Sequence, residues 1–466
     1  MHQETGVFGD QEYRNGLPAL TFHNSRFDRH SLTGSRNAVQ GPGAHAGERR
    51  AVTLAALAFF CVLAAYYVIR PVRDRLAGAT GSVALPWFFA GTFLATLAIA
   101  PAFGWLSARA RRRALLGWSY GFFIACLVAF VPLFAAQTRI GARVLGIGFF
   151  IWVSVFNLFV VSLFWSLMAD LFDGKRARRV FPLIALGGAL GALAGPALTS
   201  LLAERIGVAP LLAVSAVLLL MALGLMLHLS AQGSGRNASE PIGGSMLAGL
   251  RATFADPFLR LMALLMLCSD GVGTLAYALV ADYAKTHFAD AAARTVFYGH
   301  IDLAVNITQM ALQVGLTRWM LARFGIVSGL VLPAVVNVLM LLAVALFGAT
   351  QFGVAGVSLA LIPLMLVVTR SFAYGVTKPA SDALYTRAAR EIRYKGKNFV
   401  ETAVWRFGDV AIASALDSLR ALGATLGGIG LASAAFAGLA GWFGWRAVSA
   451  SRTGVGTTHR AKVVHP

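Results

Sequence analysis

Residues 144–168 read VLGIGFFIWVSVFNLFVVSLFWSLM and contain no charged side chain. A helix needs about 20 mostly apolar residues to cross the hydrocarbon core of a bilayer, so this stretch is long enough. Eleven other stretches of the chain are also mostly apolar and long enough to span, although several of them contain charged residues. We therefore expect an all-α integral membrane protein with twelve transmembrane helices. The expected spans are 51–69, 85–106, 114–135, 144–168, 180–203, 208–229, 259–281, 296–317, 326–348, 355–378, 399–420 and 426–446.

The composition and the placement of charge agree with this expectation. Hydrophobic residues make up 58% of the chain and charged residues 13%, whereas a soluble chain of 466 residues would carry much more polar surface. The net charge of +20 arises largely on one side of the membrane, where the loops and the C-terminal end hold 22 Lys and Arg residues against nine on the other side. Such an excess marks the cytoplasmic face. We therefore expect both termini in the cytoplasm, and membrane lipid rather than nucleic acid as the macromolecular environment.

Polar segments divide the chain. Residues 1–50 have no apolar run and lack the plan of a signal peptide, so they indicate a disordered cytoplasmic tail or an upstream extension of the true start. Residues 230–258 are rich in Gly, Ser, Asn and Pro and predict a cytoplasmic linker with a short amphipathic piece at 247–254. The linker separates two expected six-helix bundles, residues 51–229 and 259–447. Residues 448–466 are expected to form a second cytoplasmic tail. This six-plus-six division is the plan of major-facilitator transporters, in which two bundles rock around a midplane site.

The eighth span carries a polar stripe. Asp302, Asn306, Gln309 and Gln313 follow one another at i, i+4, i+7 and i+11, which places them on one helical face. In lipid these groups would have no partners, so the stripe predicts a cavity lining that faces the tenth or eleventh span. A purely structural network between helices is the alternative.

The tenth and eleventh spans carry cations. Arg370, Tyr374 and Lys378 share a helical face, and Arg406 lies three residues before Asp409, a spacing that permits an ion pair. Arginine offers a rigid fork that matches carboxylate or phosphate oxygens. We therefore expect a small anionic substrate. The expected substrate-binding residues are Arg73, Arg370, Tyr374, Lys378, Arg406, Asn306, Gln309 and Gln313. The alternative is that Arg370 pairs with Asp302, Asp409 or Glu401 as a structural bridge.

Four acids inside the spans are candidates for coupling or gating: Asp270, Asp302, Glu401 and Asp409. Ionisable groups at this depth are costly and usually face partners, water or substrate. Glycines flank Asp270 and loosen its helix, which suits a proton-binding or gating carboxylate. A helix-capping or hydrogen-bonding role is the alternative for this residue. The expected coupling partners are protons or a counter-substrate.

The fifth span carries glycine at every fourth position, at Gly187, Gly191 and Gly195. Such spacing removes side chains from one face and lets a neighbouring helix approach closely. The Gly191–Pro196 part also resembles a motif associated with antiporters of the major-facilitator superfamily.

Four stretches together resemble one family. They are YYVIRPVRDRLAG (66–78), SLFWSLMADLFDGKRARRVFPLIALGGALGALAGP (162–196), RTVFYGHIDLAVNITQMALQ (294–313) and TKPASDALYTRAAREIRYKGKNFVETAVWRFGD (377–409). These stretches resemble the bacterial major-facilitator proteins related to the ATP/ADP antiporters of plastids and intracellular bacteria, the NTP/NDP exchange family. The resemblance implies a secondary transporter of the bacterial inner membrane.

Matching residue by residue, Arg73 occupies the basic position that the exchangers carry near the end of their first span. The Gly-Lys-Ser of their eleventh span is Gly408-Asp409-Val410 here, and their fourth-span glutamate has no counterpart in residues 149–153. Two alternatives therefore stand, namely nucleotide or nucleoside-phosphate exchange and proton-coupled carriage of another small solute.

The sequence contains no HExxH and no GxxxxGK[ST] phosphate loop. We therefore expect no catalytic residues, no metal site, no cofactor and no enzymatic activity. The rival from another class is an integral-membrane enzyme or a non-transporting sensor.

Overall fold

The computed structural model describes residues 42–109, 112–136, 141–172, 174–232, 246–354, 357–386 and 396–460. The chain separates into two units, Met1–Glu48 and Arg49–Pro466, and the following concerns the second. Most of the predicted N-terminal tail and residues 233–245 of the predicted linker lie outside the described residues.

The six spans predicted before the linker are all helices of spanning length and hydropathy. They are α1 (Pro42–Thr80), α2 (Leu85–Arg109), α3 (Arg112–Ala135), α5 (Ala142–Leu171), α6 (Gly174–Ile206) and α7 (Val208–Gln232). A short 3-10 turn, η1 (Ser82–Ala84), joins α1 to α2.

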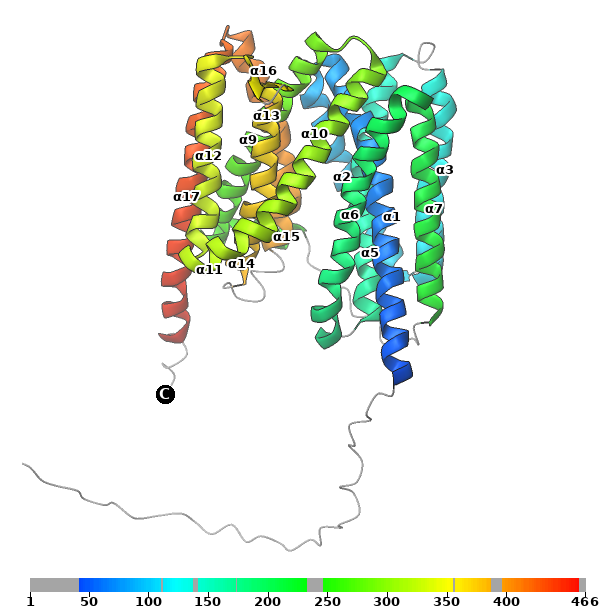
Figure 1. The fold of residues 1–466 in the computed structure, drawn as a ribbon. Coiled ribbons are helices and arrows are strands. Elements are labelled where there is room, and N and C mark those ends of the chain that lie inside the picture. Colours follow the sequence, from blue (N-terminus) through cyan, green and yellow to red (C-terminus); the bar gives the residue numbers. More distant parts are fainter. Residues whose placement is uncertain are drawn as a thin grey trace, which may run out of the picture. The chain divides into compact units, whose positions relative to one another are not determined.

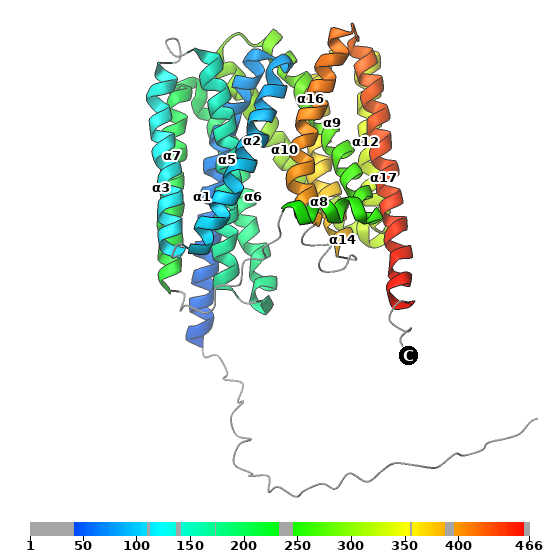
Figure 2. The ribbon, with the colours of Figure 1, turned by 180° about the vertical axis from the view of Figure 1, so that it is seen from behind.

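After the linker, the amphipathic piece is helix α8 (Met246–Ala255), which lies across the ends of the helices that follow it in Figure 2. Three further helices are, like the first six, long and apolar enough to cross a membrane. The described part of the chain therefore contains nine such helices. These three are α9 (Pro257–His287), α12 (Ile326–Phe347) and α17 (Leu426–Arg460).

The remaining three predicted spans are more polar, and a π-helical segment interrupts each of them. The eighth comprises α10 (Ala291–Ala311), η2 (Leu312–Thr317) and α11 (Arg318–Phe324). The tenth comprises α13 (Leu361–Phe372), η3 (Ala373–Thr377) and α14 (Lys378–Tyr385). The eleventh comprises α15 (Lys397–Phe399), η5 (Val400–Val404) and α16 (Trp405–Ala421).

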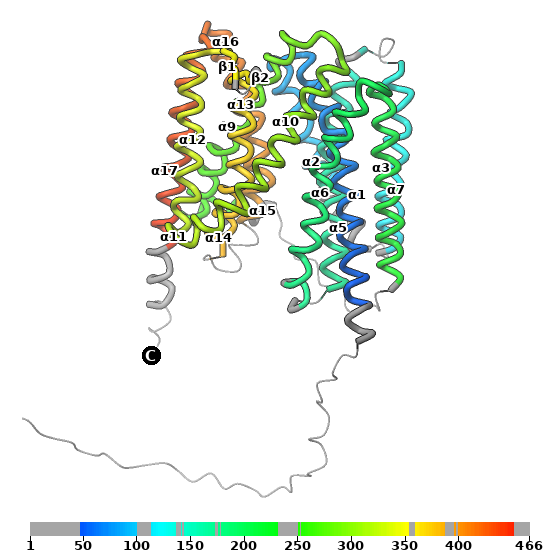
Figure 3. Tube along the Cα trace, in the orientation of Figure 1, coloured from blue at the N-terminus to red at the C-terminus, as the bar shows by residue number. Residues whose placement is uncertain are grey.

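The predicted start of the tenth span, residue 355, is wrong. A β-hairpin occupies this stretch, with β1 (Gln351–Val354) paired antiparallel to β2 (Val357–Ala360), and α13 begins only at Leu361 (Figure 3). The backbone N–H of Leu361 donates to the carbonyl of Thr350 at 3.1 Å, which closes the hairpin against the start of the helix. Valine-rich apolar runs this short fit a strand as well as a helix, so hydropathy alone did not separate the two.

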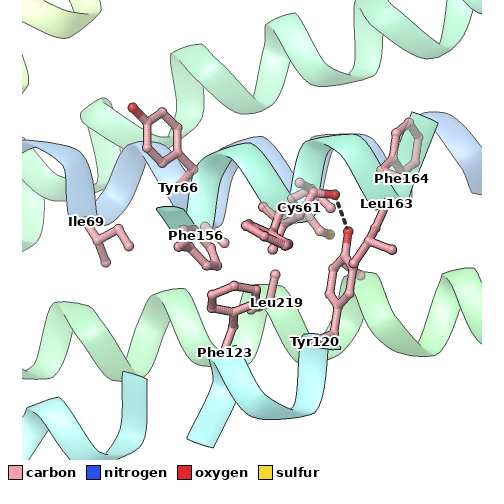
Figure 4. Packing of buried hydrophobic residues seen from close by; sticks show 14 of the residues in the cluster. Cys61, Tyr66, Ile69, Tyr120, Phe123, Phe156, Leu163, Phe164 and Leu219 are labelled. Atoms are coloured by element: carbon pink, nitrogen blue, oxygen red, sulfur yellow. Dashed lines mark hydrogen bonds between the residues drawn. The ribbon is translucent and has the colours of Figure 1, made fainter. Parts of the chain in front are cut away.

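The helices of the N-terminal half share an aromatic core (Figure 4). Phe59 stacks on Phe164 with ring centroids 4.4 Å apart, and Phe123 meets Phe156 edge-on at 5.3 Å. The buried Tyr120 hydroxyl donates to the carbonyl of Val160 at 2.8 Å, which provides the hydrogen bond that an apolar core requires. Because lipid is as apolar as these side chains, close packing rather than water exclusion holds the helices together.

The glycine stripe of α6 packs against α1, as the spacing predicted. A Cβ added at Gly187 would overlap the backbone carbonyl of Ala56, and one added at Gly191 would overlap that of Phe60. Thr199, further along α6, donates its hydroxyl to the carbonyl of Val68 at 2.9 Å. The absence of side chains on this face of α6 therefore permits backbone contact with α1.

The two halves meet along α10, which lies between α6 and the other C-terminal helices in Figure 1. Gly299 of α10 lies against Ser200 and Pro196 of α6, where an added Cβ would lie 2.6 Å from the Ser200 hydroxyl. Further along, the Asn306 amide donates to the carbonyl of Ala192 at 2.8 Å.

A second set of links joins the halves at the end of the helices where α1 terminates. The N–H of Ser82 donates to Asp282 Oδ1 at 2.7 Å, and Arg420 pairs with Asp282 Oδ2 at 2.7 Å. Arg420 also donates to the Ser82 hydroxyl, and Lys285 donates to the carbonyl of Thr80 at 3.1 Å. The halves are therefore held together at the end opposite to that where α1 begins.

The α1–α6 contact predicts a sharp difference between two glycines. Gly191→Ala should destabilise the protein by about 1–3 kcal/mol, because the new methyl group overlaps the α1 backbone. Gly224→Ala on α7 is the matched control, since a Cβ there meets no atom within 4 Å. That change should be neutral or stabilising by about 0.5–1 kcal/mol, because alanine favours helix. Thermal unfolding in detergent measures both, and equal melting temperatures for the two variants would contradict the close contact.

Candidate functional site

A cavity of about 360 Å³ lies between helices from both halves. Side chains of α1, α2, α5, α9, α10, α13, η3 and α16 line it. Its charged lining consists of Arg70, Arg73, Arg370, Arg406, Asp270 and Asp409. Its aromatic lining consists of Tyr66, Tyr67, Phe89, Phe150, Tyr277, Tyr374 and Trp405. The cavity is therefore both cationic and aromatic.

The two arginines of α1 that line the cavity, Arg70 and Arg73, share one counter-ion, Asp74. Arg73 Nε donates to Asp74 Oδ1 at 2.8 Å, and Arg73 Nη2 lies 2.6 Å from the same oxygen. Arg70 Nε lies 3.8 Å from Asp74 Oδ2, one helical turn away. Asp74 is 2% exposed, so water does not screen these contacts. The guanidinium of Arg73 also lies over the ring of Phe150, with 4.8 Å to its centroid.

Asp74 also connects α1 to the C-terminal half. The hydroxyl of Tyr277 on α9 donates to Asp74 Oδ1 at 3.0 Å, and Arg70 Nη2 lies 3.4 Å from Asp302 Oδ1 on α10. Both aspartates are buried. The charges of α1 are therefore neutralised partly from its own helix and partly from across the interface.

Arg370 differs from the other three arginines that line the cavity. Among the described residues it has no carboxylate within 4.0 Å, and its guanidinium carbon lies 5.1 Å from the centroid of the Tyr277 ring. Its three predicted bridging partners are all paired elsewhere: Asp302 with Arg70, Asp409 with Arg406, and Glu401 with Lys378. Arg370 is half-buried and lines the cavity, so its donors are available to a bound anion.

Two carboxyl groups, those of Asp270 and Asp409, line the C-terminal side of the cavity. The hydroxyl of Thr274 donates to Asp409 Oδ1 at 2.7 Å. Arg406 lies 3.6 Å from Asp409 Oδ2, the ion pair that the i, i+3 spacing permits. The two acids come from different helices, α9 and α16, and both face the cavity.

Lys378 and Glu401 lie outside this lining. Lys378 binds Glu401 and, at 3.1 Å, Asp382, while Lys397 binds Asp382 at 2.9 Å. This cluster of two cations and two acids connects α14 to α15 and η5. It is partly exposed, and its charges cancel.

The polar stripe of the eighth span divides between the cavity and contacts with three other helical segments. Gln309 lines the cavity, and Asp302 is buried against Arg70. Asn306 binds α6 as described above, and the amide of Gln313 donates to the carbonyl of Tyr374 at 3.2 Å. One part of the stripe lines the cavity, and the other part makes contacts between helices. Each of the two alternatives, a cavity lining and a structural network, therefore applies to part of the stripe.

The π-helical segments explain where two of these polar groups bind. A π-helical turn lengthens the backbone hydrogen-bonding pattern and leaves carbonyls available to side chains. The carbonyls of Tyr374 and Gly375 in η3 accept from Gln313 and from Thr317, the latter at 2.7 Å. The two irregular segments η2 and η3 thus bind each other, and they fix the position of Tyr374 beside the cavity.

Apart from Tyr374, sequence reasoning did not select the aromatic lining as site residues, and it did not select Asp74. The pattern that could have revealed Tyr277 was present, because Asp270, Thr274 and Tyr277 lie at i, i+4 and i+7 on one face of α9. Asp74 lies one turn after Arg70 and directly after Arg73, a spacing that suits a counter-ion. Among the described residues, no group of three or more His, Cys, Asp or Glu side chains is placed to hold a metal ion.

Residues 44–398 match the sequence family described as Major Facilitator Superfamily. Among curated proteins, no sequence matches this chain. Among solved structures, the chain is similar to the nucleoside transporter NupG (12% identity, TM-score 0.60, covering 86% of this chain and 98% of that one). A bacterial homologue of the iron transporter ferroportin, in an inward-facing state, has 15% identity and a TM-score of 0.60, covering 86% and 99%. The E. coli fucose:proton symporter FucP has 14% identity and a TM-score of 0.55, covering 85% and 98%. At these identities the similarity concerns the fold alone.

The shared counter-ion predicts a folding defect on its removal. Asp74→Asn should destabilise the protein by about 3–5 kcal/mol, because it leaves the buried Arg73 without its carboxylate and leaves Arg70 with Asp302 alone. Asp382→Asn is the control: its carboxylate also binds two cations, but 42% of the side chain is exposed, and the cost should stay below about 1 kcal/mol. Thermal unfolding in detergent compares the two. Similar melting temperatures would contradict the assigned role of Asp74.

Proposed function

The chain belongs to the Major Facilitator Superfamily, and from this premise we propose that it is a secondary active transporter of a small, polar anion. Transport occurs by alternating access, with the cavity described above as the substrate site. The two moving parts are the predicted bundles, residues 51–229 and 259–447, and the membrane is the bacterial inner membrane.

Arg370 is the observation that carries the proposal. Transferring a charged group from water into a protein interior is costly unless a partner compensates for it. Arg370 lines the cavity without a carboxylate partner among the described residues, whereas Arg70, Arg73 and Arg406 each have one. A substrate carboxylate or phosphate is the partner whose geometry fits the guanidinium fork.

The aromatic lining favours a nucleoside phosphate or another anion with a planar group. Tyr374 is 36% exposed, and it lies one helical turn from Arg370 on the same face. A planar ring stacked on Tyr374 would bring its anionic substituent within reach of Arg370. Exchange of nucleotides or nucleoside phosphates is therefore one form of the proposal, and proton-coupled carriage of another small anion is the other.

The links between the halves support a state closed at one end. Asp282, Arg420, Ser82 and Lys285 hold the helices together where α1 ends. In the proposed topology this end faces the periplasm, because α1 begins and α17 ends at the other, cytoplasmic end (Figures 1 and 2). Opening to the periplasm would then require these bonds to break.

The first test is Arg370→Gln. We expect a folded protein with a normal melting temperature that no longer transports, because the change removes the anion-binding fork and leaves no acid unpaired. Loss of a charged hydrogen bond should weaken anion binding by about 10- to 100-fold. The substrate is first sought by thermal shift of the purified protein against nucleotides, phosphates, sugars, amino acids and drugs. Uptake of each compound that stabilises the protein is then measured in proteoliposomes.

Arg323→Gln on α11 is the matched control, since Arg323 is exposed and does not line the cavity. It should leave uptake unchanged. Two outcomes would contradict the proposal. If Arg370→Gln misfolds, and a second change at Asp302, Asp409 or Glu401 that restores neutrality rescues folding, Arg370 is a structural bridge. If Arg370→Gln transports normally, the anion binds elsewhere.

The second test concerns the orientation in the membrane. Reporter fusions after Gln232, at the end of α7, and after Arg452, within α17, should both report the cytoplasm, as the Lys and Arg distribution predicts. A periplasmic signal at either position would contradict the topology and, with it, the six-plus-six arrangement.

A further inference from the structure

Arg75 is a buried cation of α1 that does not line the cavity. It is 5% exposed, and its Nε has no hydrogen-bond partner. Among the described residues no carboxylate lies within 4.0 Å of its guanidinium, whereas Arg70 and Arg73 on the same helix share Asp74. The ring of Phe134 on α3 lies 5.7 Å from its guanidinium carbon, a distance at which a cation–π contact is weak. An unpaired charge at this depth is costly, so Arg75 requires another compensating group.

The face of α1 that carries Arg75 meets the start of α10. Arg75 and Gly78 lie at i, i+3 on this face. Gly78 packs against Tyr298 of α10, because a Cβ added there would lie 2.6 Å from the Tyr298 hydroxyl. Arg294 precedes Tyr298 by four residues and shares its face of α10. Since α1 ends and α10 begins at the same end of the molecule (Figure 1), the side chains of Arg75, Arg294 and Tyr298 approach one another between the two halves.

These three side chains present donors that have no acceptor. The buried atoms without a hydrogen-bond partner include Arg75 Nε, Arg294 Nε and the Tyr298 hydroxyl. Tyr298 is 2% exposed, so water does not complete its hydrogen bonding. Arg294 is oriented by its Nη2, which donates to the carbonyls of Phe288 and, at 3.5 Å, Ala289. Leaving such donors unpaired is unfavourable, and three of them together are complementary to a group rich in acceptor oxygens.

The charge around these donors is positive. Arg294 and Asp290 are the charged groups of the α10 region that act on Arg75. Asp290 is exposed and caps the N-terminus of α10, where its carboxylate accepts a backbone N–H at 2.8 Å. Asp74, which precedes Arg75 in the chain, is bound to the two arginines of the cavity wall. Two arginines are therefore opposed by one carboxylate, which water screens.

We propose that Arg75, Arg294 and Tyr298 form a second oxyanion site, which takes a phosphate group between α1 and α10. None of the three lines the cavity, so the site goes beyond the proposed function. In the proposed topology it lies on the periplasmic side of the cavity, because Gly78 is one turn beyond Asp74 toward the end of α1.

The chemistry of the three side chains fits this ligand. Guanidinium groups match the oxygens of a phosphate, and the Tyr298 hydroxyl donates to a further oxygen. The bound group compensates one arginine from each half, and it thereby stabilises the contact of α1 with α10. The phosphate belongs either to a free anion or to the headgroup of a lipid, and separate binding measurements distinguish these sources.

The first experiment counts bound phosphate per chain. The purified, delipidated full-length protein in detergent is titrated at equilibrium with radiolabelled inorganic phosphate. Arg75→Met should bind one phosphate fewer than the wild-type protein. Tyr298→Phe removes only the hydroxyl and should weaken binding at this site by about 10- to 100-fold. Arg205→Met is the matched control, because Arg205 is an exposed arginine at the same end of the bundle, in the last turn of α6, and its loss should leave the count unchanged.

Thermal unfolding separates a binding role of Arg75 from a packing role. Without phosphate, Arg75→Met should melt at the same temperature as the wild-type protein or higher, because an apolar side chain of similar volume replaces an uncompensated charge. Phosphate should raise the melting temperature of the wild-type protein more than that of the variant. A packing role predicts the reverse, namely a variant that melts lower without phosphate and has the same phosphate-dependent shift as the wild-type protein. That result would overturn the inference.

The second arm uses phosphatidylglycerol in mixed micelles in place of inorganic phosphate. If Arg75→Met loses one bound inorganic phosphate, the site takes a free anion. If it loses one bound phosphatidylglycerol and no inorganic phosphate, the site takes a lipid headgroup. Counts and affinities for both probes that do not change in Arg75→Met and Tyr298→Phe would overturn the inference. If Arg75→Met does not fold, Tyr298→Phe decides by the same comparison.

The same titration keeps this site distinct from the cavity. Arg370→Gln should lower the phosphate count by one if phosphate occupies the cavity, and Arg75→Met should lower it by one in either case. An unchanged count in Arg370→Gln would therefore weigh against the cavity as a phosphate site and leave the second site intact. An unchanged count for both probes in Arg75→Met, with unchanged affinity in Tyr298→Phe, would contradict the second site and leave the proposed function standing.

Discussion

The carboxylate of Asp74 is the interaction on which the rest of the site depends. An apolar bundle in lipid provides no water to hydrate Arg70 and Arg73, so a buried acid must balance them. Asp74 contacts both arginines, and its Oδ1 also accepts from Tyr277 across the interface. One side chain thereby contacts two buried cations and joins α1 to α9, while Asp302 of α10 supplies the second negative charge, beside Arg70. The N-terminal wall of the cavity is built on these paired charges. The charges free to interact with a ligand therefore lie on the C-terminal wall, which holds Arg370.

That other side is built on irregular backbone. The three π-helical segments, η2, η3 and η5, occur in the three most polar spans of the C-terminal half. A regular helix in lipid satisfies all its backbone groups internally, whereas a π-helical turn is tolerated where protein side chains complete the hydrogen bonds. Gln313 and Thr317 do so for η3, the segment that carries Tyr374 into the cavity wall. Polar side chains in these spans thus support the backbone as well as the cavity.

Hydropathy was sufficient to predict the membrane fold and the N-terminal spans, and glycine spacing predicted the packing face of α6. Hydropathy failed at residues 351–360, because a short valine-containing run fits a strand or a helix equally well. Helical periodicity placed Asp302, Asn306 and Gln309 on one face but did not reveal which helix each would meet. That depends on how α10 crosses α6 and α1, a tertiary feature set by contacts such as Gly299 on Ser200. For the same reason, the sequence left the partner of Arg370 open among three acids.

Tyr277 links the two sides of the cavity. Its hydroxyl donates to Asp74 on α1, and its ring lies beneath the guanidinium of Arg370 on α13. Any rearrangement that separates α1 from α9 must break the hydrogen bond between Tyr277 and Asp74. The Tyr277 ring, on which the contact with Arg370 depends, is then free to move. An anion that neutralises Arg370 weakens the attraction between its guanidinium and the ring, because a cation–π contact depends on the net positive charge. Ligand binding on one half and contact between the halves therefore act on the same side chain, which gives a bound anion a direct physical route to influence how the halves are held together.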